Sequence, residues 1–350
     1  MIAAGGTAGH VVPALAVADA LRADGDEVAF IGGRRAEATL VPEHGFELHQ
    51  IEVEGMSRSH PLKALRALLR AVLAVPRSRS LLRSLAPDAV LGGGGYVSAP
   101  VGLAALSLRV PLVLSEADSH LGLSNRLLAR FARRVCLAFP IAGREGPRYR
   151  VTGRPVPAAG ASPDRAAARR GFGIPADARC VLVFGGSLGA RSINLAAAEA
   201  FAAAPFHVLH ISGSRDYPEL AARSLPDTYH LLEYLDLERF GEALDAADLA
   251  VARAGGSVFE LAAHGLPAIL VPYPQAAGDH QSANARWMER AGAAITVPDR
   301  ELTAAWLSRT VGGLLGDEGR LDEMARCARS LARPDAARAV AGELLAAAGR

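Results

Sequence analysis

Short, continuously apolar runs alternate with longer helical stretches along almost the whole chain. Continuous hydrophobicity is typical of strands covered on both faces, and strands that alternate with helices form parallel sheets. The pattern therefore predicts a doubly wound α/β protein. The predicted strand segments are EVAFIGG (27–33), AVLGGGG (89–95), PLVLSEA (111–117), RVCLAFP (134–140), CVLVFGG (180–186), FHVLHISG (206–213), LAVARAGG (249–256) and PAILVPYP (267–274).

A polar segment separates two such series. Residues 151–179 carry four prolines and precede a new apolar run at Cys180, which is typical of a domain boundary. A length of 350 residues also suits two domains. We expect a first domain over 1–153, a linker leading into the second domain over 154–179, and a second domain over 180–334. The end of the chain is helical in pattern, and from about residue 335 we expect it to pack back onto the first domain.

A glycine loop occurs twice, as GGTAG at 5–9 and GGSLG at 185–189. Each copy follows an apolar strand and precedes a predicted helix, over 11–22 and 190–201. Loop N–H groups and a helix N-terminus together attract anions, although such glycines also form simple tight turns. Two copies at equivalent places favour ligand binding. The first strand is short, which is compatible with a translation start a few residues upstream.

A third glycine loop, GGGGYVSAP at 92–100, follows another strand of the first domain. We expect all three loops to open at the carboxyl ends of strands, where ligands bind in such sheets. None is a P-loop or a GxGxxG fingerprint.

Individual side chains near these loops suggest chemistry. His10 starts a helix, where the dipole disfavours imidazolium and a neutral, proton-accepting ring is expected; it could equally be an ordinary helix-start residue. Glu260 lies early in another helix, where a carboxylate binds a ribose diol or caps the first turn. Asp279, Gln281 and Asn284 offer polar groups suited to sugar hydroxyls.

Composition excludes several classes of protein. The net charge of +2 gives no reason to expect nucleic acid as a partner. The three cysteines are widely spaced, which disfavours disulfides and zinc and fits the cytosol. The amino terminus does not have a signal-peptide pattern. Residues 89–108 are uncharged, but five glycines and a proline exclude a membrane span.

One segment combines basic charge with apolar spacing. Residues 55–87 hold seven basic residues and no acidic one, and the leucines and valine between them can form a helical face. Such a face suits adsorption to an anionic membrane or packing into a core with a solvated arginine edge. The basic residues are Arg58, Lys63, Arg66, Arg70, Arg77, Arg79 and Arg83, and the apolar ones are Leu62, Leu65, Leu68, Leu69, Val72 and Leu73.

Six motifs in order resemble the MurG family of UDP-N-acetylglucosamine transferases: GGTAGHVVPALAVADAL, GGGGYVSAP, GLSNRLLA, GGSLGARSIN, ELAAHGLPAILVPYP and DHQSANA. The resemblance implies a GT-B fold, with two Rossmann-like domains facing across a cleft, and inverting transfer of N-acetylglucosamine to undecaprenyl-diphospho-N-acetylmuramyl-pentapeptide, which converts lipid I to lipid II in peptidoglycan synthesis. It implies no essential bound metal or other cofactor. It also implies a peripheral location on the cytoplasmic face of the cell membrane through segment 58–83, and partners among the cell-wall synthesis proteins.

The resemblance also implies roles for particular residues. On the acceptor side, His10 is the candidate either to deprotonate the acceptor hydroxyl or to contact phosphate, and Glu116 is the second candidate base. The other acceptor-side positions are Thr7, Gly9, Tyr96 and Asn125. The donor-side positions are Ser187 for the diphosphate, Arg253 nearby, Glu260 for the ribose, Gln281 and Asn284 for the sugar, and Tyr234 and Leu235 near the uracil.

The chain departs from the family pattern at three places. The family's His-Glu-Gln-Asn reads SEAD at 115–118, which keeps Glu116, and His120 is a candidate to compensate. The family's Gly-Asn-Pro-Val-Arg reads GRPVP, so Pro157 replaces the arginine and Arg154 the asparagine. We expect Arg154 to supply the lost charge to the donor. The turn between Arg253 and Glu260 is one residue shorter.

These departures keep two alternatives open. One is a related GT-B transferase with another sugar or lipid acceptor. The other is a UDP-sugar-binding protein without catalysis.

Overall fold

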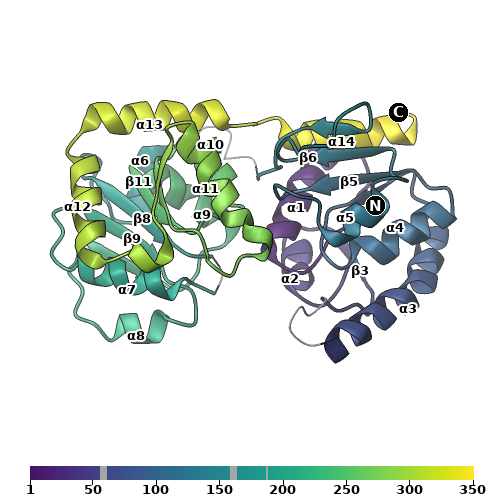
Figure 1. Ribbon diagram of the computed structural model, residues 1–350, viewed down its shortest axis with the longest axis horizontal. Coiled ribbons are helices and arrows are strands. Elements are labelled where there is room, and N and C mark those ends of the chain that lie inside the picture. The colour runs from purple at the N-terminus through teal and green to yellow at the C-terminus, as the bar shows by residue number, and fades with distance from the viewer. Residues whose placement is uncertain (56–60, 158–163, 187) are drawn as a thin grey trace. The chain divides into compact units, whose positions relative to one another are not determined.

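The chain folds into two compact α/β units in the computed structural model, which describes residues 1–55, 61–157, 164–186 and 188–350 (Figure 1). The amino-terminal unit comprises Met1–Pro157 and Arg333–Arg350, and the carboxy-terminal unit comprises Ala158–Ala332. The sequence-based boundaries lie at residue 153 and near residue 335.

The amino-terminal unit is built on a seven-stranded parallel sheet in the order β3-β2-β1-β4-β5-β6-β7. The central strand β1 is only two residues long, and its Ile2 lies between Phe30 and Leu91 of the neighbouring strands. All three side chains are fully buried. The strands are β1 (Ile2–Ala3), β2 (Ala29–Gly32), β3 (Glu47–Gln50), β4 (Val90–Gly92), β5 (Leu112–Glu116), β6 (Arg134–Leu137) and β7 (Tyr149–Val151).

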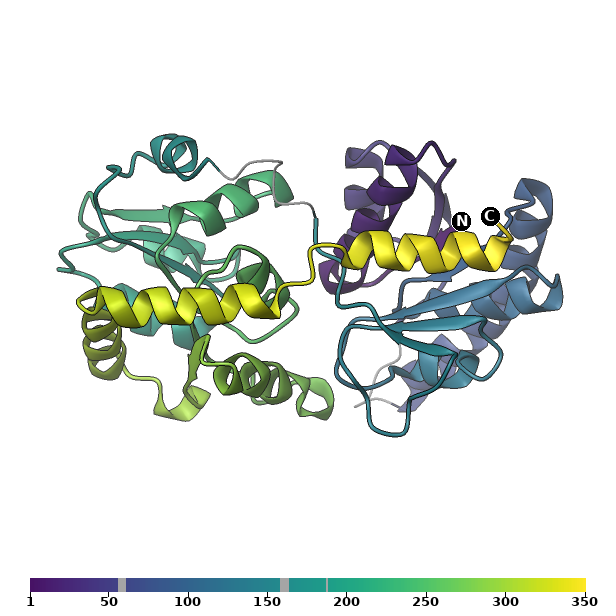
Figure 2. The ribbon, with the colours of Figure 1, turned by 90° about the horizontal axis from the view of Figure 1, so that it is seen from above.

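Helices cover both faces of this sheet. They are α1 (Ala8–Ala23), α2 (Ala36–Glu43), α3 (Pro61–Leu85), α4 (Ser98–Ser107), α5 (Leu123–Leu128) and α14 (Ala336–Ala348). The last of these lies along the amino-terminal unit in Figure 2. Its Val340, Ala341 and Leu344 join the core that α1 also forms. Burying a side chain such as Val340 or Leu344 contributes about 1.5–3 kcal/mol, so the carboxy terminus is an integral part of this unit.

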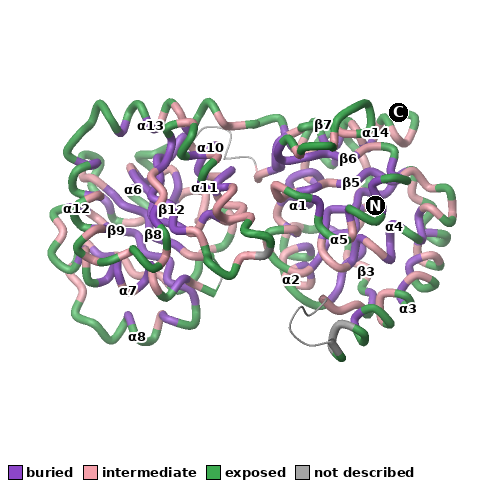
Figure 3. The backbone as a smooth tube through the Cα atoms, viewed as in Figure 1, coloured by how far each residue is buried: buried purple, intermediate pink, exposed green. Residues whose placement is uncertain are grey.

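The carboxy-terminal unit repeats the design with six parallel strands in the order β10-β9-β8-β11-β12-β13. The strands are β8 (Cys180–Phe184), β9 (His207–Ile211), β10 (Tyr229–Leu232), β11 (Leu249–Ala252), β12 (Ala268–Leu270) and β13 (Ala294–Thr296). The α-helices are α6 (Arg165–Gly171), α7 (Arg191–Ala200), α8 (Tyr217–Ala221), α9 (Leu237–Ala246), α10 (Val258–Ala263), α11 (His280–Arg290), α12 (Ala304–Leu315) and α13 (Glu318–Leu331). Figure 3 shows buried strands inside and exposed helix faces outside in each unit.

The segment 154–179, expected as a linker, holds a folded helix. α6 packs on α9, and the guanidinium of its buried Arg169 donates to Asp248 Oδ2 at 2.9 Å and to the Ala246 carbonyl at 3.1 Å. Arginine-rich helices are usually solvated, but the partly buried Asp248 pairs with Arg169 from a distant part of the chain. The second part of this segment is therefore integral to the carboxy-terminal unit.

The strands that the hydrophobic pattern did not identify share one property. β3, β7, β10 and β13 are the four outer strands of the two sheets. An outer strand has one neighbour and is less completely covered, so its sequence need not be continuously apolar. β3, for example, reads ELHQ and is only partly buried.

Each sheet has a point where the strand order reverses. It lies between β1 and β4 in the amino-terminal unit and between β8 and β11 in the carboxy-terminal unit. Ligands bind in α/β sheets beyond the carboxyl ends of the strands at such points. All three predicted glycine loops follow one of these strands.

Candidate functional site

The first and third glycine loops pack directly against each other in the amino-terminal unit. A Cβ added at Gly95 would lie 1.9 Å from the Gly5 carbonyl oxygen, and one added at Gly94 would lie 2.7 Å from Cδ2 of His10. Both glycines have positive φ, which side-chain-bearing residues rarely adopt. Only glycine therefore brings the loop after β4 against the His10 ring.

A residue absent from the sequence-based candidates holds this arrangement together. Glu37, in the first turn of α2, is fully buried. Its carboxylate accepts hydrogen bonds from Gly6 N and Gly33 N, both at 2.8 Å, and from the Tyr96 hydroxyl at 3.0 Å. Burial and the neighbouring Glu37 raise the pKa of Tyr96. The sequence feature that could have identified Glu37 is an acidic residue shortly after Gly32 and Gly33, where β2 ends. Acidic residues are common in the first turns of helices, so this feature is weak.

Ser98 fixes the third loop in a similar way. Its buried Oγ accepts from Gly94 N at 2.9 Å and lies 3.0 Å from the Ala3 carbonyl oxygen and 2.8 Å from that of Gly94, with one hydroxyl proton to donate. Ser98 lies within the motif GGGGYVSAP, but the motif alone did not predict these hydrogen bonds.

His10 lies in the first turn of α1 and is partly buried. Its Nδ1 is 3.4 Å from Thr7 Oγ1, the side chain that precedes the helix. Burial lowers the pKa of the imidazole, a shift that Asp118 opposes and Arg154 reinforces. A neutral ring at neutral pH can accept a proton, which is the requirement for a general base.

Arg154 lies beside this loop rather than in a linker. It is only 7% exposed, and its Nη2 donates to the Gly9 carbonyl at 2.6 Å while Nη1 donates to the Ala117 carbonyl at 3.2 Å. The structure thus places its charge in the amino-terminal unit, next to Thr7, Gly9 and His10. A role of Arg154 toward the donor stays a prediction.

Glu116 and Asn125 form a pair at the end of β5. The buried Glu116 carboxylate accepts from Asp118 N at 3.1 Å, Gly122 N at 2.8 Å and Asn125 Nδ2 at 3.0 Å. Burial raises the pKa of Glu116, and these hydrogen bonds offset part of that rise. With both oxygens occupied, Glu116 shapes the loop that carries Asp118.

The SEAD departure leaves this pair intact. Asn125 Nδ2 also donates to the backbone carbonyl of Ser115 at 3.0 Å, a contact that does not depend on the side chain at 115. Its Oδ1 is buried and has no hydrogen-bond partner among the described residues. His120 lies in the exposed part of the same loop, and its compensating role stays a prediction.

The second glycine loop belongs to the carboxy-terminal unit, and Ser187 at its centre lies outside the described residues. Gly189 N donates to the Gly186 carbonyl at 2.8 Å, which closes the turn before α7. A Cβ at Gly189 would lie 1.9 Å from the Ser212 carbonyl oxygen, whereas one at Gly186 would meet open space. Packing therefore explains why residue 189 is glycine, but it does not explain why residue 186 is.

A buried polar network supports this loop from below. Asn194 Nδ2 donates to the Ser212 carbonyl and to Asp216 Oδ2, both at 2.8 Å, and its Oδ1 lies 3.0 Å from His210 Nε2. Burial lowers the pKa of His210 to about 3. The ring is neutral, with its Nε2 protonated toward Asn194 and its Nδ1 facing the Tyr229 hydroxyl at 2.6 Å. The motif GGSLGARSIN contains Asn194, but its partners come from elsewhere in the chain.

Arg253, Gln281 and Asn284 come together at the carboxyl ends of β11 and β12. The Arg253 guanidinium forms an ion pair with Asp299, donates to Ser192 Oγ at 2.9 Å and lies over the Tyr273 ring at 5.4 Å. Gln281 Oε1 accepts from Tyr273 N at 2.9 Å. Asn284 Nδ2 donates to the Ala254 carbonyl at 3.0 Å. Much of the hydrogen-bonding capacity of these side chains is thus used within the unit.

The other donor-side candidates lie at the same edge of the sheet. Leu235 follows β10, and Glu260 lies in the first turn of α10 after β11. Their roles toward uracil and ribose stay predictions, because the contacts that would test them involve a ligand.

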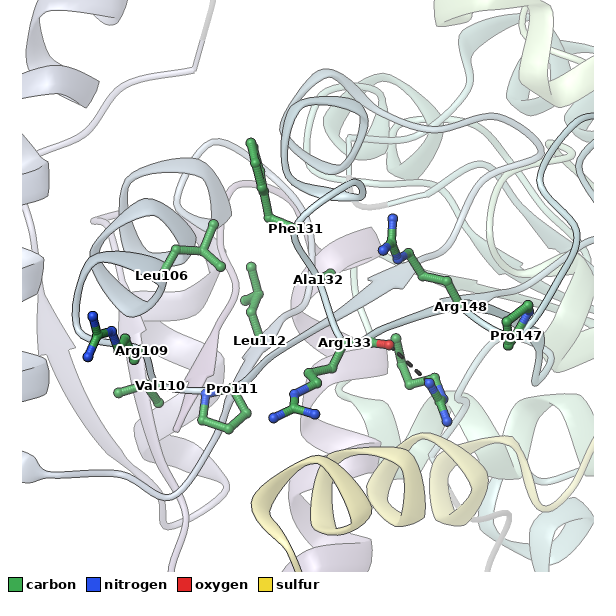
Figure 4. A pocket seen from close by; sticks show the side chains of 11 residues that line it. Leu106, Arg109, Val110, Pro111, Leu112, Phe131, Ala132, Arg133, Pro147 and Arg148 are labelled. Atoms are coloured by element: carbon green, nitrogen blue, oxygen red, sulfur yellow. Dashed lines mark hydrogen bonds between the residues drawn. The ribbon is translucent and has the colours of Figure 1, made fainter.

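A separate cavity of about 440 Å³ lies at the opposite edge of the amino-terminal sheet, before β5, β6 and β7 (Figure 4). Arg109, Arg133 and Arg148 surround it, and Leu106 and Phe131 form part of its apolar wall. None of the predicted site residues lines it. Among the described residues, no three His, Cys, Asp or Glu side chains gather as a metal-binding group.

Comparisons with known proteins agree with the motif order. Residues 1–137 match the glycosyltransferase family 28 N-terminal domain and residues 180–340 match the C-terminal domain of the same family. A crystal structure of MurG from Acinetobacter baumannii superposes with a TM-score of 0.75 at 32% identity, covering 99% of this chain and 98% of that one.

Full-length relatives carry one name. The UDP-N-acetylglucosamine–N-acetylmuramyl-(pentapeptide) pyrophosphoryl-undecaprenol N-acetylglucosamine transferase of Salinibacter ruber is 41% identical over 100% of this chain and 97% of its own length. Its counterpart from Rubrobacter xylanophilus is 44% identical over 95% of this chain and 98% of its own length. With two GT-B-like units and this similarity over its whole length, the chain belongs to the MurG family of glycosyltransferases.

Proposed function

We propose that this protein transfers N-acetylglucosamine from UDP-N-acetylglucosamine to undecaprenyl-diphospho-N-acetylmuramyl-pentapeptide, with inversion at the anomeric carbon. The relatives named above support the donor and the acceptor. The observation that carries the chemistry is His10, a partly buried histidine with a lowered pKa, held between two glycine loops at the switch point of the amino-terminal sheet.

The proposed reaction is a single displacement. The acceptor hydroxyl gives its proton to the His10 imidazole as its oxygen bonds to the anomeric carbon of the donor. The bond from that carbon to the β-phosphate oxygen breaks, and the electron pair leaves with UDP. N–H groups of the second glycine loop and the N-terminus of α7 stabilise the negative charge on the leaving diphosphate.

Transfer of radiolabelled sugar to the lipid acceptor tests the assignment of His10. His10→Gln should lower kcat by about 10²-fold or more, as expected for loss of a general base, while UDP-N-acetylglucosamine binding measured by calorimetry stays unchanged. His44→Gln is the matched control, because His44 lies in the same unit but at the end of α2. Full turnover by His10→Gln would exclude His10 as the base.

The same assay separates the alternatives. A wild-type protein that binds the UDP-sugar without transfer to any lipid acceptor would be a non-catalytic binding protein. Transfer with a different UDP-sugar or lipid would indicate a related transferase.

Peripheral membrane contact through α3 is part of the proposal. No described helix is both long and apolar enough to span a bilayer. The predicted apolar face of α3 does not pack into the core, because all six of its residues are exposed: Leu62 is 81% and Leu73 is 73% exposed. Small residues, Ala67, Ala74 and Ser78, are buried on the opposite side. An exposed apolar stripe of this kind is typical of a surface that binds a partner or a membrane.

The charges around the stripe support an anionic membrane as that partner. Arg77 and Arg83 are exposed on α3. Arg66 and Arg70 instead form ion pairs with Glu54, which directly precedes the acid-free segment 55–87. Arg58 and the Lys63 side chain lie outside the part of the chain that the structure describes. Exposed basic residues next to apolar ones attract anionic lipids by about 1 kcal/mol each.

Exposed apolar side chains also occur on the two helices that follow α3. α3 packs on α4, and α4 packs on α5. Leu103 on α4 and Leu127 on α5 are exposed, as is Phe131 at the rim of the arginine-lined cavity. We include the exposed side chains of α4 and α5 in the proposed membrane surface.

Vesicle flotation tests this surface. The double variant Leu69→Gln/Leu73→Gln should lose most of its binding to vesicles rich in anionic phospholipid, while Val151→Gln, at an exposed position on β7 of the same unit, should bind as the wild type does. Wild-type binding should weaken with added salt, because exposed charges are screened. Unchanged flotation of the double variant would exclude α3 as the contact.

A further inference from the structure

Two of the departures from the family pattern meet at His10. Asp118 stands where the pattern has the last residue of His-Glu-Gln-Asn, and Arg154 stands where Gly-Asn-Pro-Val-Arg has asparagine. Two neutral asparagines are thus replaced by one acid and one base. Both charges act on the His10 imidazole, with opposite signs.

The sequence of α1 explains why the His10 loop needs a clamp. A helical carbonyl accepts from the N–H four residues later, and for Gly9 that residue is Pro13, which has no N–H. The Gly9 carbonyl, which belongs to the peptide bond that precedes His10, is therefore left without its helical donor. Arg154 Nη2 supplies a donor at 2.6 Å.

The same guanidinium reaches the loop after β5. Its Nη1 donates to the Ala117 carbonyl at 3.2 Å, directly before Asp118. Asp118 N is in turn held by Glu116 Oε1 at 3.1 Å. One planar, buried group thus fixes the backbone next to His10 and the backbone next to Asp118.

We propose that Arg154 is a positioning residue for His10, because its guanidinium holds the carbonyl before His10 and the carbonyl before Asp118, and that the charges of Arg154 and Asp118 act on the imidazole with opposite signs. The inference rests on the proposed function only in taking His10 as the base. Burial favours the neutral ring, and the two charges act on it with opposite signs.

The surroundings of the imidazole define the electrostatics. Burial lowers its pKa, Asp118 raises it, Arg154 lowers it, and the more distant Glu37 raises it. Thr7 Oγ1 and the backbone at Gly94 complete the contacts. Removing the Arg154 charge should therefore raise the pKa of His10, and removing the Asp118 charge should lower it further.

Histidine NMR on the full-length resting protein measures this directly. In Arg154→Asn the His10 pKa should rise, and in Asp118→Asn it should fall. The double variant should return near the wild type. Shifts in the same direction, or none in either variant, would overturn the proposal, because loosened packing has no reason to produce opposite signs.

Arg154→Lys separates the clamp from the charge. It keeps a positive charge but lacks the planar fork that reaches two carbonyls. We expect a His10 pKa close to that of the wild type, with kcat lowered several-fold and donor KM unchanged. Thermal unfolding of each variant establishes that the protein is folded, and wild-type kcat in Arg154→Lys would exclude the positioning role.

The pH profile of transfer distinguishes this inference from the proposed function. If the NMR shifts occur and the acidic limb of the pH profile of kcat moves with them, both the proposed function and the present inference hold. If the NMR shifts occur but the limb stays in place, the tuning holds and His10 is not the base. If His10→Gln is inactive and the His10 pKa ignores both charges, the proposed function holds and the tuning fails.

Discussion

The buried carboxylate of Glu37 accepts a hydrogen bond from the backbone N–H of Gly6 at 2.8 Å. A glycine-loop N–H is thereby already bound to an anionic group of the protein itself. Substrate phosphate cannot use this donor without displacing Glu37. The first glycine loop therefore differs from a simple phosphate cradle: part of it is organised internally, with His10 at its end.

Glu37→Gln should destabilise the amino-terminal unit by about 1–3 kcal/mol, because one amide oxygen replaces two carboxylate oxygens facing three donors. Urea unfolding measures the cost, and kcat/KM for the lipid acceptor should fall while donor KM stays constant. Glu43→Gln is the control on the exposed end of the same helix. Equal stability of the two variants would contradict the role assigned to Glu37.

Gly95→Ala should be far more damaging than Gly143→Ala. Both glycines have similar positive φ, 76° and 72°, but a Cβ at Gly95 would meet the Gly5 carbonyl oxygen at 1.9 Å and one at Gly143 would meet nothing within 4 Å. The backbone strain alone costs about 1–2 kcal/mol. Thermal unfolding should show a larger loss for Gly95→Ala and a small one for Gly143→Ala, and similar losses would argue against the close contact of the two loops.

Pro13→Ala should make the kcat of sugar transfer less dependent on Arg154. An alanine at 13 restores the helical N–H that the Gly9 carbonyl lacks, so His10 is held without the guanidinium. Arg154→Asn should then lower kcat less in the Pro13→Ala background than in the wild type, as a double-mutant cycle measures. Additive effects would show that Arg154 does not act through the Gly9 carbonyl.

His210 should make the stability of the carboxy-terminal unit depend on pH. Its pKa is about 3 in the folded protein against 6.5 ordinarily, so below pH 6.5 the unfolded chain binds a proton that the folded one does not. Stability is then fully present above pH 6.5 and falls by up to about 1.4 kcal/mol per unit toward pH 3. Urea unfolding from pH 7.5 to 5 should show a shallower dependence for His210→Gln.

The value at pH 7.5 isolates the packing effect of the His210 substitution, because the histidine is then neutral in both states. A slope that His210→Gln leaves unchanged would mean that another group causes the pH dependence.

Hydrophobic pattern and motif order identified the central strands, the three glycine loops and the family. These features are encoded locally: a strand covered on both faces must be apolar along its length, and a strand-to-helix turn needs glycine at fixed places. The hydrophobic pattern did not identify outer strands such as β3 and β7, because the sequence of an outer strand is not required to be continuously apolar.

The sequence by itself thus determined two doubly wound units, their motifs and His10 as the candidate base. Only the tertiary structure decided that Leu62, Leu69 and Leu73 of α3 face outward while Ala67, Ala74 and Leu82 face the core, because both faces of that helix are apolar enough to be buried. Only it placed Arg154 beside His10 and Glu37 beneath the first loop, because those contacts join residues 145 and 31 positions apart. Local pattern specifies which elements form, and long-range packing specifies which side chains meet.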